Sequence, residues 1–151
     1  MKAACVYQLK DRFLVHAESR TTAGVWLASE PFLVLPNHPT FEEIGKALLQ
    51  ALDNSSNDAP HPVDWKAVHA PRLAAAGVKT ERSFQEGAKL VRVSSQERQY
   101  IIEPYLNGGA SGDSKGFHAI ATQRSAVPSD VNSVNLGANV FEALKLCSCA
   151  A

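Results

Sequence analysis

Residues 88–104, "AKLVRVSSQERQYIIEP", contain the pattern that decides the fold class. Two strand-like runs, 88–94 and 98–104, flank a short polar segment near 95–97. Two such runs joined by a connection too short for a helix are typical of an antiparallel hairpin. Pro104 is expected to end the second strand, because proline has no N–H to donate to the ladder of a sheet.

The N-terminal residues predict a second hairpin. Apolar runs at 4–9 and 12–18 are separated by the polar pair at 10–11. In the second run apolar residues recur at every other position, which predicts a strand with one mostly buried face.

Two further stretches are extended in pattern. Residues 25–35 are interrupted by Pro31, which predicts an edge strand or a bend, and residues 117–123 predict another strand. The strand runs come in pairs and do not alternate with helices. The sequence therefore predicts an α+β fold with a mainly antiparallel sheet.

Two amphipathic helices are expected to pack on this sheet. Thr40 and Glu43 have the spacing of a capping box, and the apolar residues that follow predict a helix over 40–53. Similar spacing predicts a C-terminal helix over 136–147, with Asn135 as its candidate N-cap.

Residues 63–79 give a weaker helical pattern. Pro71 interrupts it, so one helical turn is expected before the proline and another after it, stopped by Gly77. A chain of 151 residues has the length of one domain, which we expect to span residues 1–151.

Composition argues against several classes of protein. Fifteen basic residues balance fifteen acidic ones, whereas a direct nucleic-acid binder usually has a basic excess. No apolar run has the length of a signal peptide or a membrane helix, and three cysteines at the two ends form no disulfide framework. We therefore expect a cytoplasmic protein that binds neither membrane nor nucleic acid.

The segment "NGGASGDSKGFH" at 107–118 raises the question of a phosphate-binding loop. A P-loop requires glycine, lysine and serine or threonine in sequence at the start of a helix, but Lys115 lies between Ser114 and Gly116. The residues that follow are strand-like. The segment therefore predicts a flexible connection between two antiparallel strands, with no nucleotide bound.

Other candidate chemical groups are isolated in the sequence. His16 and His118 lie in strand-like runs, where they could assemble an acid–base site in space or be structural. Cys147 falls on the apolar face of the last helix and is expected in the core. Trp26 and Trp65 are candidate interface anchors, although tryptophan in such runs is more often core. No cofactor motif, metal-ligand spacing or catalytic residue is indicated.

Charge is uneven along the chain. Residues 30–64 contain six acids and one base, whereas 66–98 contain seven bases and three acids. An acidic helix and loop suit a basic protein partner, although a solvated helix face that only aids solubility is the alternative. The candidate partner-binding residues are Glu42, Glu43, Asp53, Asp58 and Asp64.

The C-terminal half, over residues 83–147, contains a set of motifs that belong together: "SFQEGAKLVRVSSQERQYIIEPYLN", "FHAI" and "NLGANVFEALKLC". Their framework positions are Phe84, Gly87, Ile102, Pro104, Leu136, Gly137, Ala143, Leu144 and Cys147. In these motifs the chain resembles the immunity proteins of contact-dependent growth inhibition (CDI) systems.

This resemblance implies a cytosolic, non-enzymatic antidote without a cofactor. Its partner would be the toxic C-terminal domain of a large secreted effector, commonly a nuclease, which it would bind and neutralise. Two alternatives remain at the level of sequence: a small enzyme with a histidine-based acid–base site, or a general protein-interaction module.

Overall fold

The computed structural model describes residues 1–149. An 8-stranded sheet forms its centre, with strands β3-β2-β1-β4-β5-β6 side by side and β7 and β8 both paired with β5. All neighbours are antiparallel except β5 and β8. The strands are β1 Lys2–Gln8, β2 Phe13–Arg20, β3 Trp26–Leu35, β4 Lys89–Gln96, β5 Gln99–Asn107, β6 Phe117–Ala119, β7 Ser125–Pro128 and β8 Ser148–Cys149.

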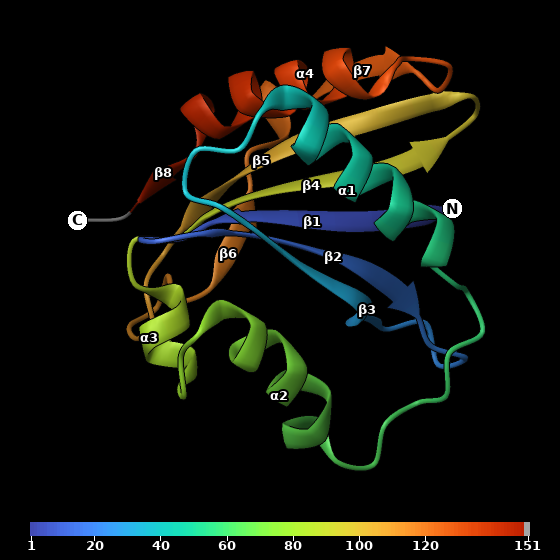
Figure 1. Cartoon of the computed structure of the whole chain (residues 1–151). Helices are drawn as coiled ribbons and strands as arrows, with labels where there is room; N and C mark the ends of the chain where they lie inside the picture. The colour runs from blue at the N-terminus through green and yellow to red at the C-terminus, as the bar shows by residue number, and fades with distance from the viewer. Residues whose placement is uncertain (150–151) are drawn as a thin grey trace.

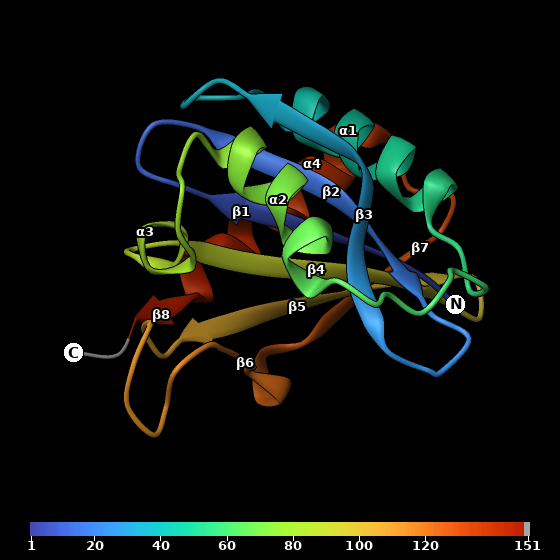
Figure 2. The ribbon, with the colours of Figure 1, turned by 90° about the horizontal axis from the view of Figure 1, so that it is seen from below.

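Helices cover both faces of this sheet. Figure 1 shows α1 and α4 side by side above the sheet and α2 and α3 below it, and Figure 2 shows the lower pair from beneath. The predicted α+β fold with a mainly antiparallel sheet and a C-terminal helix is confirmed. The helices are α1 Phe41–Asn54, α2 Trp65–Ala76, α3 Glu81–Gln85, the 3-10 turn η1 Ala121–Gln123 and α4 Ser133–Leu146. Within residues 1–149, no helix is both long and apolar enough to cross a membrane.

The second strand departs from the expected half-buried pattern, because both of its faces are covered. Phe13 and Val15 belong to the core beneath α1 and α4, while Leu14 belongs to the smaller core on the side of α2 and α3. His16 is also buried, with 1% of its surface exposed. The expectation of one buried face was wrong because it assumed helices on one face of the sheet, whereas helices cover both faces.

The helix starts and ends have local causes. Thr40 and Glu43 form the predicted capping box at the start of α1. The N-cap of α4 is Asn132, one turn before the predicted Asn135, since the Asn132 side chain accepts the hydrogen bond from the Asn135 amide. The predicted break at Pro71 was also wrong: α2 runs through it, and ends at Gly77 as expected, with φ of 74°.

Exposure explains how α2 tolerates its proline. Pro71 removes the hydrogen bond to the carbonyl of Ala67, and both residues lie on the exposed side of the helix. Water can therefore satisfy the freed carbonyl.

The edge of β5 also differs from the prediction. Pro104 does not end β5, which continues to Asn107. The carbonyl of Pro104 accepts the amide of Ile120 at 2.9 Å, just after the end of β6. The ring nitrogen of Pro104 faces the same side, away from β4. No ladder bond is lost there. The strand predicted over 117–123 ends at Ala119, and η1 then carries the chain to β7, which pairs with the first half of β5.

The position of β3 agrees with its sequence. It is an edge strand, and its register with β2 shifts between His16 and Ala17, next to Pro31. The edge or bend predicted from Pro31 is confirmed.

Candidate functional site

The five candidate acidic residues are exposed but do not gather at one point. Glu42 and Glu43 lie in the first turn of α1, and Asp53 lies eleven residues later, about 16 Å along the helix axis. Asp58 lies in the loop that follows, and Asp64 is the N-cap of α2. The chain that carries them runs along α1 and then through the loop that leads to the start of α2 (Figure 1), and we call these five residues the acidic line.

Several of these carboxylates have local structural roles. Glu42 pairs with Lys46 at 2.8 Å, and Glu43 closes the capping box of α1. Asp64 accepts the amide of Lys66 at the start of α2. The carboxylates of Asp53 and Asp58 have fewer local contacts. Among residues 1–149, the Asp58 carboxylate accepts a hydrogen bond only from the hydroxyl of Ser56, at 3.2 Å.

The glycine-rich segment is a hydrogen-bonded connection between β5 and β6. Gly108 donates to Gly116 at 2.8 Å, and Gly116 donates to Gly109 at 2.9 Å. Its base is held by Asn107, whose buried amide bonds Gln85, Ala88 and the N–H of Gly109. The predicted connection between antiparallel strands is confirmed. Asn107 was missed because an asparagine before glycines usually signals only a turn.

The two strand histidines lie far apart. Strands β1, β4 and β5 separate β2, which carries His16, from β6, which carries His118. At about 4.8 Å per strand the separation is about 19 Å. His16 is buried and His118 is exposed. The structure therefore does not bring them into one acid–base site.

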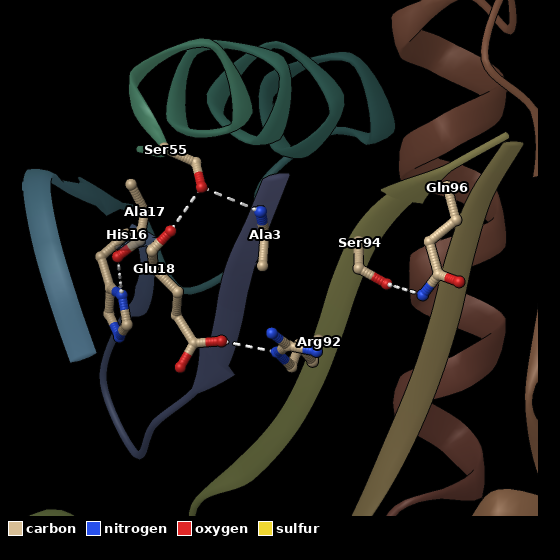
Figure 3. Close-up of polar contacts among 8 residues, drawn as sticks. All are labelled: Ala3, His16, Ala17, Glu18, Ser55, Arg92, Ser94 and Gln96. Atoms are coloured by element: carbon tan, nitrogen blue, oxygen red, sulfur yellow. Dashed lines mark hydrogen bonds and ion pairs between the residues drawn. The ribbon is translucent and has the colours of Figure 1, made fainter. Parts of the chain in front are cut away.

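A polar cluster lies on the lower face of the sheet, where α2 leaves it partly open. The Glu18 carboxylate pairs with the Arg92 guanidinium, and each side chain is 18% exposed. Figure 3 shows this pair on the side of the sheet away from α1, close to His16. The Arg92 guanidinium lies 5.0 Å from the centre of the Trp26 ring. This arrangement neutralises Glu18 and occupies one face of Trp26.

His16 lies beside this pair. Its ring is held between those of Tyr7 and Phe32, with centroids at 5.6 and 5.5 Å. Its Nδ1 lies 2.8 Å from the carbonyl oxygen of Ala17, while Nε2 has no hydrogen-bond partner among residues 1–149. Burial lowers the pKa of His16, so the ring is neutral at pH 7.

A cavity of about 180 Å³ lies between this face and α2. His16, Glu18 and Trp26 line it from the sheet, and Trp65, His69 and Arg72 line it from α2. Trp65 is 41% exposed, so its expected core position was wrong, since α2 lies at the margin of the sheet. No pattern in the sequence indicates this cavity, because its walls come from segments that are far apart in the chain.

Cys147 lies in the core, as predicted, and its thiol donates to the Leu90 carbonyl at 3.2 Å. Within residues 1–149, no group of histidine, cysteine or acidic side chains has the arrangement of a metal site.

Comparison with known families identifies the class of protein. The sequence matches the family of CDI immunity proteins over residues 2–147. The chain belongs to this family. In this CDI immunity protein, framework residues of the C-terminal half hold the core together: Gly137 packs against the carbonyl of Phe41, and Leu136 and Leu144 of α4 are buried in the main core.

Solved structures share the fold of this CDI immunity protein. A protein of unknown function from Neisseria meningitidis superposes with a TM-score of 0.77 at 18% identity, over 97% of this chain and 94% of that one. A toxin and immunity complex from Yersinia pseudotuberculosis contains a chain with a TM-score of 0.76 at 13% identity, over 97% of each chain. A search of curated proteins gives no significant match.

Proposed function

We propose that this CDI immunity protein binds the toxic C-terminal domain of its cognate effector and neutralises it. The observation that carries the proposal is the family match over residues 2–147. The fold shared with a chain from a toxin and immunity complex supports it. The protein acts by stoichiometric binding and not by catalysis, which agrees with the separation of His16 from His118.

The toxin in this proposal is a nuclease that acts in the cytoplasm, where the immunity protein meets it. A nuclease needs a basic surface to hold the phosphate backbone, and an acidic inhibitor is complementary to such a surface. The line of acidic residues from Glu42 to Asp64 supplies this complementarity.

Within this line, Asp53 and Asp58 are the best candidates for direct contact. Both are exposed, and neither serves as a helix cap. Glu42, Glu43 and Asp64 contribute to the field that attracts a basic partner, and their local bonds keep them in place. The protein itself binds no nucleic acid or membrane in this account.

Protection of living cells tests the function. The toxin domain encoded beside this protein would be induced in bacteria, with or without this chain. We expect growth and intact nucleic acid only when the chain is present. A toxin domain from an unrelated CDI system is the control, and it should remain toxic. Growth arrest by the cognate toxin despite expression of the folded chain would overturn the proposal.

A further inference from the structure

Nε2 of His16, on the lower side of the sheet, is a buried nitrogen without a hydrogen-bond partner among residues 1–149. The carbonyl of Ala17 can only accept, so Nδ1 of His16 carries the proton in their hydrogen bond. In a neutral imidazole the other nitrogen, Nε2, is then a bare acceptor. Nε2 is buried and has no donor among residues 1–149. Buried polar atoms are nearly always hydrogen-bonded, so this one calls for a donor.

A cavity lies next to the ring. His16 is among the residues that line the cavity beneath α2, whose volume of about 180 Å³ can hold a small side chain or a few water molecules. Nε2 itself is covered, so side chains of the cavity wall must shift for a donor to reach it. Figure 3 shows the imidazole pointing away from Ser55 and α1, toward the side of the sheet on which α2 lies.

The charges around the cavity determine the kind of donor. Glu18 is paired with Arg92, and the Arg72 guanidinium lies 2.6 and 2.7 Å from the two carboxylate oxygens of Glu81. Each charged group is therefore already matched. An ammonium or guanidinium entering the cavity would have no free counter-ion and would be costly to bury. An uncharged donor avoids this cost.

The mouth of the cavity has the character of a protein interface. Trp65 of the cavity wall is exposed. Val63 and Val25 are also exposed, and in the sequence they lie within two residues of the lining residues Trp65 and Trp26. Exposed tryptophan is typical of binding hot spots. Asp64, adjacent to Trp65, belongs to the acidic line already assigned to the toxin. The surface proposed to bind the toxin therefore extends along the chain to the mouth of the cavity.

We propose that the cavity receives an uncharged hydrogen-bond donor from the toxin, a hydroxyl or carboxamide side chain, which donates to Nε2 of His16. The inference rests on the proposed function and adds the chemistry of one contact within it. Trp65 forms the wall of the socket, and the exposed apolar residues around it exclude water from the bond.

The test is the affinity of the co-encoded toxin domain for the His16→Phe protein. Phenylalanine keeps the ring between Tyr7 and Phe32 but removes both nitrogens. The toxin's donor would be buried without a partner, so binding should weaken by about tenfold or more. Trp65→Ala should also weaken binding. His118→Phe, on the exposed strand β6, is the matched control and should bind as the unchanged protein does.

A measurement on the unchanged protein covers the case in which His16→Phe fails to fold. In isotope-labelled protein, the NMR signal of the His16 Nε2 should move upfield when toxin is added, as an acceptor gains a donor. Normal toxin binding by His16→Phe, or an unmoved Nε2 signal in a formed complex, would overturn the inference and leave the proposed function standing. Absence of any binding by the unchanged protein would overturn both.

Discussion

Gly137 of α4 lies directly against the backbone carbonyl of Phe41 at the start of α1. A Cβ at Gly137 would overlap that oxygen, and a Cβ at Gly45 would overlap the carbonyl of Ser133 in the same way. The two helices therefore touch at two glycines. This close approach places α1 and α4 together over the main core.

Gly137→Ala should lower the free energy of unfolding by about 1–3 kcal/mol, because the clash is with backbone that cannot move aside alone. The gain in helix propensity from alanine, about 1 kcal/mol, opposes the clash but does not exceed it. Denaturant unfolding measures the change. Asn139→Ala, on the exposed side of α4, is the control and should be near neutral. An unfolding free energy for Gly137→Ala at or above that of the unchanged protein would contradict the close contact.

The ion pair of Glu18 and Arg92 gives a second prediction. Arg92→Met keeps much of the side-chain length but leaves the Glu18 carboxylate, 18% exposed, without its partner. Stability should fall by about 2 kcal/mol, and adding Glu18→Gln should restore part of the loss. Thermal unfolding of the two single variants and the double variant forms the test. Additive losses would show that the two side chains do not interact.

The buried His16 predicts a pH dependence of stability. Burial lowers its pKa in the folded protein, so on acidification the unfolded chain takes up a proton that the folded one resists. The free energy of unfolding should therefore fall as pH drops below the ordinary histidine value of 6.5, by up to about 1.4 kcal/mol per pH unit.

Other groups titrate in this range, so the comparison is with His16→Phe. The stability of the unchanged protein relative to this variant should decrease from pH 7 to pH 5. A constant difference across that range would mean that His16 titrates equally in both states.

The acidic line predicts how the toxin associates. Reversing Asp53 and Asp58 to lysine should slow association by about tenfold at low salt, with little effect on stability, since exposed charges act mainly on the encounter. Stopped-flow association across a salt series measures this. Each single reversal, Asp53→Lys or Asp58→Lys, is also compared with Glu142→Lys on the exposed side of α4, which changes the net charge by the same amount. If association is unchanged and does not vary with salt, the interface lies elsewhere, and the basic 66–98 segment is the next candidate.

Sequence predicted the parts of the fold that local chemistry determines. The two hairpins and the capping box of α1 each depend on neighbouring residues, so their patterns were sufficient. The packing of α2 and α3 as a second layer could not be predicted from the sequence. Ala76 is the only buried residue in α2, so this helix has no strong apolar face. Burial on both faces of β2 was missed for the same reason.

The candidate site shows the same division. The acidic residues were selected because they are close in sequence, and their role in binding stays a prediction; in the structure α1 separates Glu42 from Asp53 by most of its length. The cavity at His16 could not be predicted. It requires the register of β2 with β1 and β3 and the placement of Trp65 over their face, and both are set by tertiary packing.

Direct titration of the purified chain with its co-encoded toxin domain tests the central claim. We expect a one-to-one complex with a dissociation constant in the nanomolar range or tighter, about −12 kcal/mol, and loss of toxin activity in proportion to the chain added. A toxin domain from an unrelated CDI system should show no binding. A folded chain that leaves its cognate toxin unbound and fully active at micromolar concentration would contradict the account.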